Sequence, residues 1–156
     1  LKLAVYKINE ITTNLRVKAK IGVETTGKND EVGSLEDVID IVKRTHGTEP
    51  VINWAHLHAR GYGGLRTEND YMRVLSKLKH ELGHGWVTSA YFMFSGVSYG
   101  PQGEIKHIPL RTSDMQLKHM IKESMAMDIK GTLILEDPEK EKLILRMLED
   151  LADMVR

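Results

Sequence analysis

Histidines and carboxylates in this sequence occur at places from which they could share a metal ion. His56 lies three residues after Asn53, and His107 lies in a long loop that contains glycines. Glu24 and Glu136 each end a short apolar run. Because the chain has no cysteine, a metal would be held by imidazole, carboxylate or amide groups, which bind zinc, manganese or iron. These residues therefore predict a candidate metal site.

Each of these residues also has a simpler interpretation. Glu24 could be an exposed loop acid, Glu136 could help to cap a helix, and His107 could be incidental to its loop. His56 and His58 would share a face if a strand continued through both, although paired surface histidines are common. The joint placement at successive strand ends favours a site. The remaining histidines fall on predicted helices or helix exits and are expected at the surface: His46, His80, His84 and His119.

The stretch ARGYGGLR, residues 59–66, combines three glycines with two arginines. The glycines would let a ligand approach the backbone closely, and Arg60 and Arg66 could meet phosphate groups. The pattern is neither a Walker loop nor a Rossmann fingerprint, so it gives no support for nucleotide binding. The alternative is a flexible connection between a strand and a helix.

Four apolar runs alternate with amphipathic stretches along the chain. Strands are predicted near residues 20–25, 51–56, 87–94 and 132–136, with one helix before the first strand and one after each strand. This alternation indicates an α/β fold with a parallel sheet. Four such units are half of a (β/α)₈ TIM-type barrel, and an open four-stranded sheet is the alternative. In both architectures the chemistry lies at the carboxyl ends of the strands.

Local signals place several helix boundaries. Ser34 and Asp37 have the spacing of a capping box, and Asp137 followed by Pro138 predicts a helix start. The chain opens without methionine and already in helical rhythm, so we expect it to belong to a longer protein. The residues that carry this opening rhythm are Leu1, Val5, Ile8, Ile11 and Leu15.

Length and composition limit the classes of protein to consider. With 156 residues, the chain is expected to form a single domain, residues 1–156. Lys plus Arg and Asp plus Glu both total 22, so net charge gives no support for nucleic-acid binding, although one face could still be basic. No apolar run approaches the ~18 residues of a membrane helix, and no signal peptide is visible. The cytoplasm is therefore the expected location.

Four motifs follow one another in a familiar order: GVETTGK, VINWAHLHARGYGGLRTENDY, FSGVSYGPQGEIKHIPL and LILEDP. From about residue 20 to 150 the chain resembles the C-terminal half of endonuclease IV-type apurinic/apyrimidinic endonucleases, which belong with the xylose-isomerase-like barrels. The resemblance implies a (β/α)₈ barrel with up to three metal ions, usually zinc, with manganese as the alternative. It also implies hydrolysis of DNA 5′ to abasic sites.

The resemblance assigns roles to particular residues. It implies metal ligands at Glu24, His56, His107 and Glu136, and catalytic roles for the two glutamates among them. It implies a DNA-facing loop from residue 60 to 66, with contacts from Arg60, Tyr62 and Arg66. Because a half-barrel has open sheet edges, the missing half or a second copy is expected as a partner.

Three positions depart from the family pattern. Asn53 replaces an aspartate, Met93 replaces a histidine, and Ile105 stands where an acid is expected, with Glu104 adjacent. An amide or thioether is a weaker ligand for zinc than carboxylate or imidazole, so the isolated chain is expected to bind at most one ion and not to cut DNA at a useful rate. Two alternatives remain, a sugar isomerase or epimerase on the related barrel and a paralogue that binds without cutting.

Overall fold

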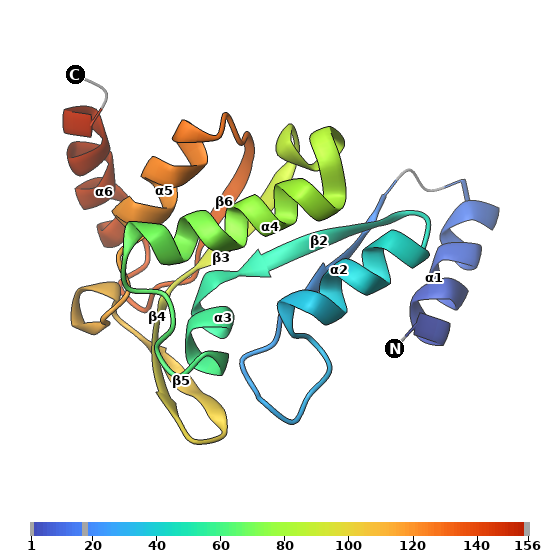
Figure 1. Ribbon diagram of the computed structural model, residues 1–156, viewed down its shortest axis with the longest axis horizontal. Coiled ribbons are helices and arrows are strands. Elements are labelled where there is room, and N and C mark those ends of the chain that lie inside the picture. Colours follow the sequence, from blue (N-terminus) through green and yellow to red (C-terminus); the bar gives the residue numbers. More distant parts are fainter. Residues whose placement is uncertain (1, 17–18, 155–156) are drawn as a thin grey trace.

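The structure, a computed structural model, describes residues 2–16 and 19–154 and is built on a four-stranded sheet (Figure 1). The strands lie in the order β1–β2–β3–β6, and all three pairings are parallel. The predicted α/β class and parallel sheet are therefore confirmed. The bounds of the strands are β1 (Ile21–Glu24), β2 (Thr48–Asn53), β3 (Ala90–Phe94) and β6 (Gly131–Leu135).

Five α-helices and a short sixth one accompany the sheet in the described residues. They are α1 (Lys2–Asn14), α2 (Leu35–Arg44), α3 (Trp54–Arg60), α4 (Glu68–Val87), α5 (Leu117–Ala126) and α6 (Glu141–Met154). A single 3₁₀ turn spans Leu110–Thr112. The predicted capping box is present, because the Ser34 hydroxyl accepts from the Asp37 amide at 3.1 Å and the Asp37 carboxylate accepts from the Ser34 amide at 3.0 Å. No helix among the described residues is long and apolar enough to cross a membrane.

The two faces of the sheet are covered unequally. Val23, Ile52 and Phe92 are buried on the face against which α2 and α4 pack, and Figure 1 shows these helices lying along the sheet. The opposite face, which we call the open face, carries Met93 and Ile134 as register partners. Ile134 remains 36% exposed. The prediction of a partly bare face is therefore confirmed.

The two terminal helices differ from expectation in different ways. On α1 Val5 is buried, while Ile8 and Ile11 are exposed, as is Leu15 just beyond the helix. Leu1 lies outside the described residues. The predicted start of the last helix at Pro138 is wrong, because α6 begins at Glu141. The Asp137 side chain does accept from the Glu139 amide, as an N-cap would. Lys140, however, has a φ of 52°, in the left-handed region, so the helix cannot run through it.

Two elements were not predicted, and both carry candidate site residues. The strand expected over 51–56 ends at Asn53, whose side-chain oxygen accepts from the His56 amide at 3.3 Å and caps α3. The expected loop after β3 contains an antiparallel hairpin, formed by β4 (Gly96–Gly100) and β5 (Gly103–Ile108). Gly96 permits the close crossing at its base, since a Cβ there would lie 2.5 Å from the Ile108 carbonyl oxygen.

Candidate metal centre

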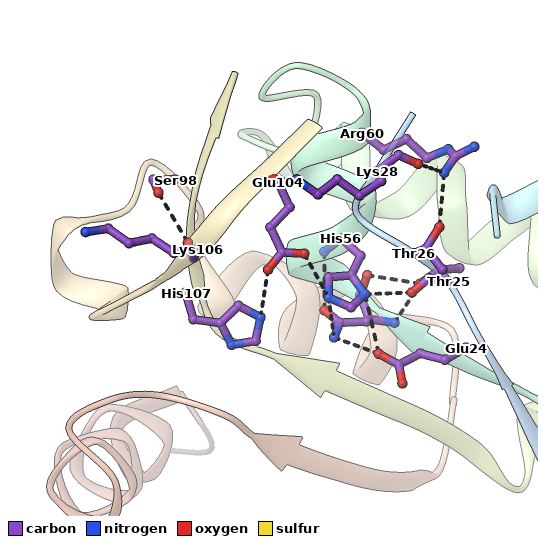
Figure 2. A network of polar contacts seen from close by, with 11 residues as sticks. Glu24, Thr25, Thr26, Lys28, His56, Arg60, Ser98, Glu104, Lys106 and His107 are labelled. Carbon is purple, nitrogen blue, oxygen red and sulfur yellow. Dashed lines mark hydrogen bonds and ion pairs between the residues drawn. The ribbon is translucent and has the colours of Figure 1, made fainter. Parts of the chain in front are cut away.

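Three possible metal ligands meet where α3 faces the hairpin (Figure 2). His56 Nε2 lies 3.1 Å from Glu104 Oε2, and His107 Nε2 lies 3.4 Å from Glu104 Oε1. One ligand atom from each residue lies within 4.8 Å of the others. Two donors that bind an ion tetrahedrally at about 2.1 Å are about 3.4 Å apart. The spacing of these three residues, which we call the metal triad, therefore suits one ion.

The hydrogen bonds of His56 determine which ring nitrogen is free. His56 Nδ1 lies 2.6 Å from the Thr25 carbonyl oxygen, and a carbonyl can only accept, so Nδ1 carries the proton. In the neutral ring, Nε2 then presents a lone pair to the Glu104 carboxylate. A divalent ion between Nε2 and the carboxylate could be held by both groups. In metal-binding histidines, the ring nitrogen that does not bind the metal typically donates to a backbone carbonyl or a carboxylate in this way.

A β-bulge brings Glu104 into the triad. Val97 pairs with His107 and Tyr99 pairs with Glu104, so Ile105 is the extra residue on β5. Residues directly opposite each other in a hairpin share a face, and a bulge shifts the alternation by one residue. Glu104 therefore shares a face with His107, and Ile105 is turned outward with 66% of its surface exposed.

The Glu104 side chain packs closely against the turn after β1. A Cβ at Gly27 would lie 2.3 Å from Glu104 Oε2, so any other residue there would displace the carboxylate. The Glu104 amide donates to the Gly27 carbonyl at 2.9 Å, and Lys28 Nζ donates to the Glu104 carbonyl at 2.6 Å. Glu104 is thus tied to this turn as well as to the hairpin.

Glu24 and Asn53 lie beside His56 but outside the triad. The Asn53 amide nitrogen donates to Glu24 Oε1 at 3.0 Å, and the same oxygen lies 3.4 Å from His56 Nδ1. Because Asn53 Oδ1 caps α3, its NH₂ group must point toward Glu24 and toward His56 Nε2, which is 3.4 Å away. A hydrogen-bond donor in this place opposes a cation, whereas a carboxylate would attract one.

The other two predicted positions on the sheet edge are not part of the triad. Met93 is the register partner of Asn53 on β3, so it faces the same open side. Glu136 follows β6, and its amide donates to the Phe94 carbonyl at 3.0 Å. Within residues 2–16 and 19–154, the metal triad is the single group of three possible ligands at metal-binding spacing. The structure thus joins His56 and His107 with Glu104, which the sequence indicated only as a neighbour of Ile105.

The residues expected to face DNA make hydrogen bonds within the protein. The Arg60 guanidinium donates to the Thr26 hydroxyl at 3.2 Å and to the backbone carbonyls of residues 28, 29 and 31, in the turn after β1. Arg60 therefore holds that turn together. Tyr62 is 59% exposed. Its hydroxyl donates to the Pro101 carbonyl at 2.9 Å and accepts from Asn29 at 2.7 Å. Tyr62 therefore leaves a ring face accessible beside the hairpin tip.

A second histidine on α3 has entirely different surroundings. His58 is fully buried. Its Nδ1 accepts from the Leu65 amide at 3.1 Å, so its Nε2 donates to Asp114 Oδ1 at 2.8 Å. Asp114 Oδ2 also accepts from the Tyr99 hydroxyl and lies 2.9 Å from Arg66 Nη2. We call His58, Asp114, Tyr99 and Arg66 the His58 brace.

The protonation of the brace follows from burial and from its hydrogen bonds. Burial lowers the pKa of His58 more than its bond to Asp114 raises it. Burial alone would raise the pKa of Asp114, but the bonds from Tyr99 and His58 outweigh that effect and lower it. A neutral imidazole donating to an ionised carboxylate is the consistent arrangement. His56 and His58 would share a face only if the strand continued through both, and it does not, because β2 ends at Asn53 and both lie on α3. Residues two positions apart on a helix point about 200° away from each other.

Comparison with known proteins gives a relative but no assigned function. The chain is 27% identical over 141 residues to an uncharacterized protein of Methanocaldococcus jannaschii. The match covers 90% of this chain and 51% of that protein, so the chain spans about half the length of its relative. No family model matches the chain.

Proposed function

We propose that this chain is part of a metal-dependent phosphodiesterase that holds a divalent ion at the metal triad. The observation that carries the proposal is the convergence of His56, Glu104 and His107 beside the carboxyl end of β2. Parallel α/β folds place their chemistry at this edge. Two imidazoles and one carboxylate, with a coordination position left for water or substrate, suit zinc and also manganese.

The proposed chemistry divides between the ion and the chain. A bound divalent ion would polarise a phosphate oxygen and lower the pKa of a water molecule. The chain supplies the orientation, because the Thr25 carbonyl holds the His56 ring and the Gly27 turn holds Glu104. Glu24, next to His56 and bonded by Asn53, is the candidate for accepting a proton. A catalytic role for Glu136 rests on the family resemblance alone.

DNA with abasic sites is the proposed substrate, incised on the 5′ side of the lesion. This assignment rests on the resemblance to endonuclease IV-type enzymes. The exposed ring of Tyr62 and the exposed Arg66 side chain, next to the hairpin that carries Glu104, are compatible with it. Arg60 would act indirectly, by holding the turn that contacts Glu104.

The open face supports the proposal that the working protein is a (β/α)₈ barrel. Met93 and Ile134 lie side by side on that face, and Ile134 is 36% exposed. The relative is about twice as long as the region that matches this chain. We propose that a further half-barrel covers the open face, with a second copy of the chain as the alternative.

A paralogue that binds without cutting is the second candidate function. Asn53 favours it, because its neutral NH₂ group, which faces Glu24 and His56, stands where the family resemblance implies an anionic aspartate. Such a protein would keep the metal triad and its DNA-facing loop but lack the charge needed to stabilise the transition state.

An incision assay separates these functions. The full-length protein, loaded with Zn²⁺ or Mn²⁺, is given a duplex with one abasic site and the matched intact duplex. We expect incision 5′ to the abasic site and its loss in Glu104→Gln, which removes the anionic ligand but keeps the side-chain shape. Binding of the damaged duplex without incision would indicate the paralogue, and turnover of a ketose would indicate the isomerase.

A further inference from the structure

The hairpin β4–β5 forms a separate two-stranded sheet that does not join the main one. An isolated hairpin is marginally stable in water. Its position depends on backbone bonds to the turn after β1, such as the one from the Glu104 amide to the Gly27 carbonyl, and on side-chain contacts with α3. Two of the three triad ligands, Glu104 and His107, belong to this hairpin, and the third belongs to α3. Whatever fixes the hairpin against α3 therefore also fixes the geometry of the metal triad.

Two pairs of side chains join the hairpin to α3. One is the His56–Glu104 pair of the triad, and the other is His58 with Tyr99. Tyr99 stands directly opposite Glu104 in the hairpin register, so both side chains leave the same face. Glu104 reaches His56. The Tyr99 ring packs edge-on against His58, with 5.1 Å between centroids and an interplanar angle of 85°.

Hydrogen bonds hold the Tyr99 side chain in its contact with His58. The Tyr99 hydroxyl donates to Asp114 Oδ2 and accepts from Arg66 Nη2, both at 2.9 Å. The other Asp114 oxygen accepts from His58. The loop also fits closely around the hydroxyl, since a Cβ at Gly63, where φ is +82°, would lie 2.1 Å from it.

We propose that Tyr99 and Asp114 are positioning residues that hold the hairpin so that Glu104 and His107 face His56 before any ion arrives. Their side chains bond to each other, to His58 and to Arg66, which are not triad ligands. Their hydrogen bonds join the hairpin, the 61–66 loop and the start of α5 to the helix that carries His56. An ion then binds a preformed site without having to order the hairpin. The inference rests on the metal triad of the proposed function.

Metal affinity in Tyr99→Phe tests the inference. The substitution removes the hydroxyl and keeps the ring against His58. Zn²⁺ affinity is measured on the full-length protein by competition with a chromophoric chelator, far below the melting temperature. We expect about tenfold weaker binding, the size of effect seen when partners that orient metal ligands are removed. Tyr6→Phe, on α1 with 63% of its surface exposed, is the matched control and should bind as the wild type does.

The visible spectrum of the Co²⁺-saturated protein separates positioning from ligation. We expect Tyr99→Phe at saturation to give the wild-type spectrum, because the ligands are unchanged. An altered saturated spectrum would mean that Tyr99 acts on the ligands in another way and would overturn the inference. If Tyr99→Phe does not fold, Asp114→Asn provides the same test with a side chain of equal size.

Two further outcomes distinguish the failure of this inference from that of the proposed function. Wild-type affinity in both brace variants would overturn the inference and leave the metal triad intact. A wild-type protein that binds neither Zn²⁺ nor Co²⁺ would contradict the metal triad itself, and the inference would fall with it.

Discussion

His56 and His58 lie two residues apart on the same short helix, yet their surroundings assign them opposite roles. The His58 ring is wholly buried, and each of its nitrogens has a hydrogen-bond partner of the right type. The His56 side chain is 18% exposed, and its Nε2 faces a carboxylate that cannot donate when ionised. A histidine with both nitrogens satisfied is structural. The Nε2 atom of His56 faces the Glu104 carboxylate and lies 3.4 Å from the Asn53 amide nitrogen, and we propose that this nitrogen is the one that would bind an ion.

The same contrast separates the metal triad from the His58 brace as wholes. The brace contains its own cation in Arg66, so the Asp114 carboxylate is neutralised inside the protein. The triad has one carboxylate and contains neither lysine nor arginine. The Asp114 carboxylate of the brace is thus balanced within the protein, whereas under the proposed function a divalent ion would balance the Glu104 carboxylate of the triad.

The largest expected effect comes from replacing each histidine by alanine. His56→Ala should weaken zinc binding at least a hundredfold, because a direct ligand is lost, while the melting temperature changes little. His58→Ala should lower the free energy of unfolding by about 3 kcal/mol, since it leaves a cavity and removes the donor that Asp114 Oδ1 now has. For a chain of this size that is roughly 6–12 °C. Chelator competition and thermal melts of the metal-free protein measure the two effects.

His80→Ala serves as the control for both measurements, because that side chain is 85% exposed. If His58→Ala lost metal binding completely while remaining folded, or if His56→Ala destabilised the protein more than His58→Ala, the division of roles between the two histidines would be wrong.

A smaller change is expected from restoring the two altered family positions. In the full-length protein, Asn53→Asp with Met93→His replaces a hydrogen-bond donor by an anion and a thioether by an imidazole. The number of zinc ions per chain should rise, as should phosphodiesterase activity. Elemental analysis of the dialysed protein provides the count, with Asn53→Ala/Met93→Ala as a control for loss of the original side chains. An unchanged ratio would mean that these are not ligand positions.

The smallest expected effect is a pH dependence of the brace. The pKa of Asp114 is lower in the folded protein than its ordinary value of 3.8, so the unfolded chain binds a proton first as the pH falls. The stability from this carboxylate is therefore fully present above about pH 4 and is lost as the pH falls through the folded-state pKa. Thermal melts between pH 5 and 2.5 should show a shallower decline for Asp114→Asn than for the wild type.

Asp128→Asn is the control for that measurement, because the Asp128 side chain is 83% exposed. Equal declines in the wild type and Asp114→Asn would indicate that the brace carboxylate is not stabilised by its partners.

The parallel sheet could be predicted from sequence because its signals are local. Short apolar runs alternate with amphipathic helices, and the Ser34 box marks one helix start. The same signals placed Glu24 and Asn53 at strand ends. His56 reaches the triad from a helix that Asn53 caps, and not from the strand end that the sequence indicated.

The rest of the site depends on contacts between distant segments. Glu104 faces His107 only because Ile105 is bulged, and the sequence carries no clear mark of that bulge. His58 is buried by a partner 56 residues away. The hairpin was missed because its strands are short and rich in glycine, which is typical of loops.

The central claim is that Glu104, and not the residue at position 105, completes the metal triad with His56 and His107. Its most direct test is a zinc titration of the wild type, Glu104→Ala and Glu104→Ala/Ile105→Asp, with calorimetric readout. We predict one zinc ion per chain at the triad of the wild type, at least hundredfold weaker binding in Glu104→Ala, and no recovery in the double variant, because position 105 points outward. Unchanged binding in Glu104→Ala, or full recovery with the aspartate at position 105, would contradict the account.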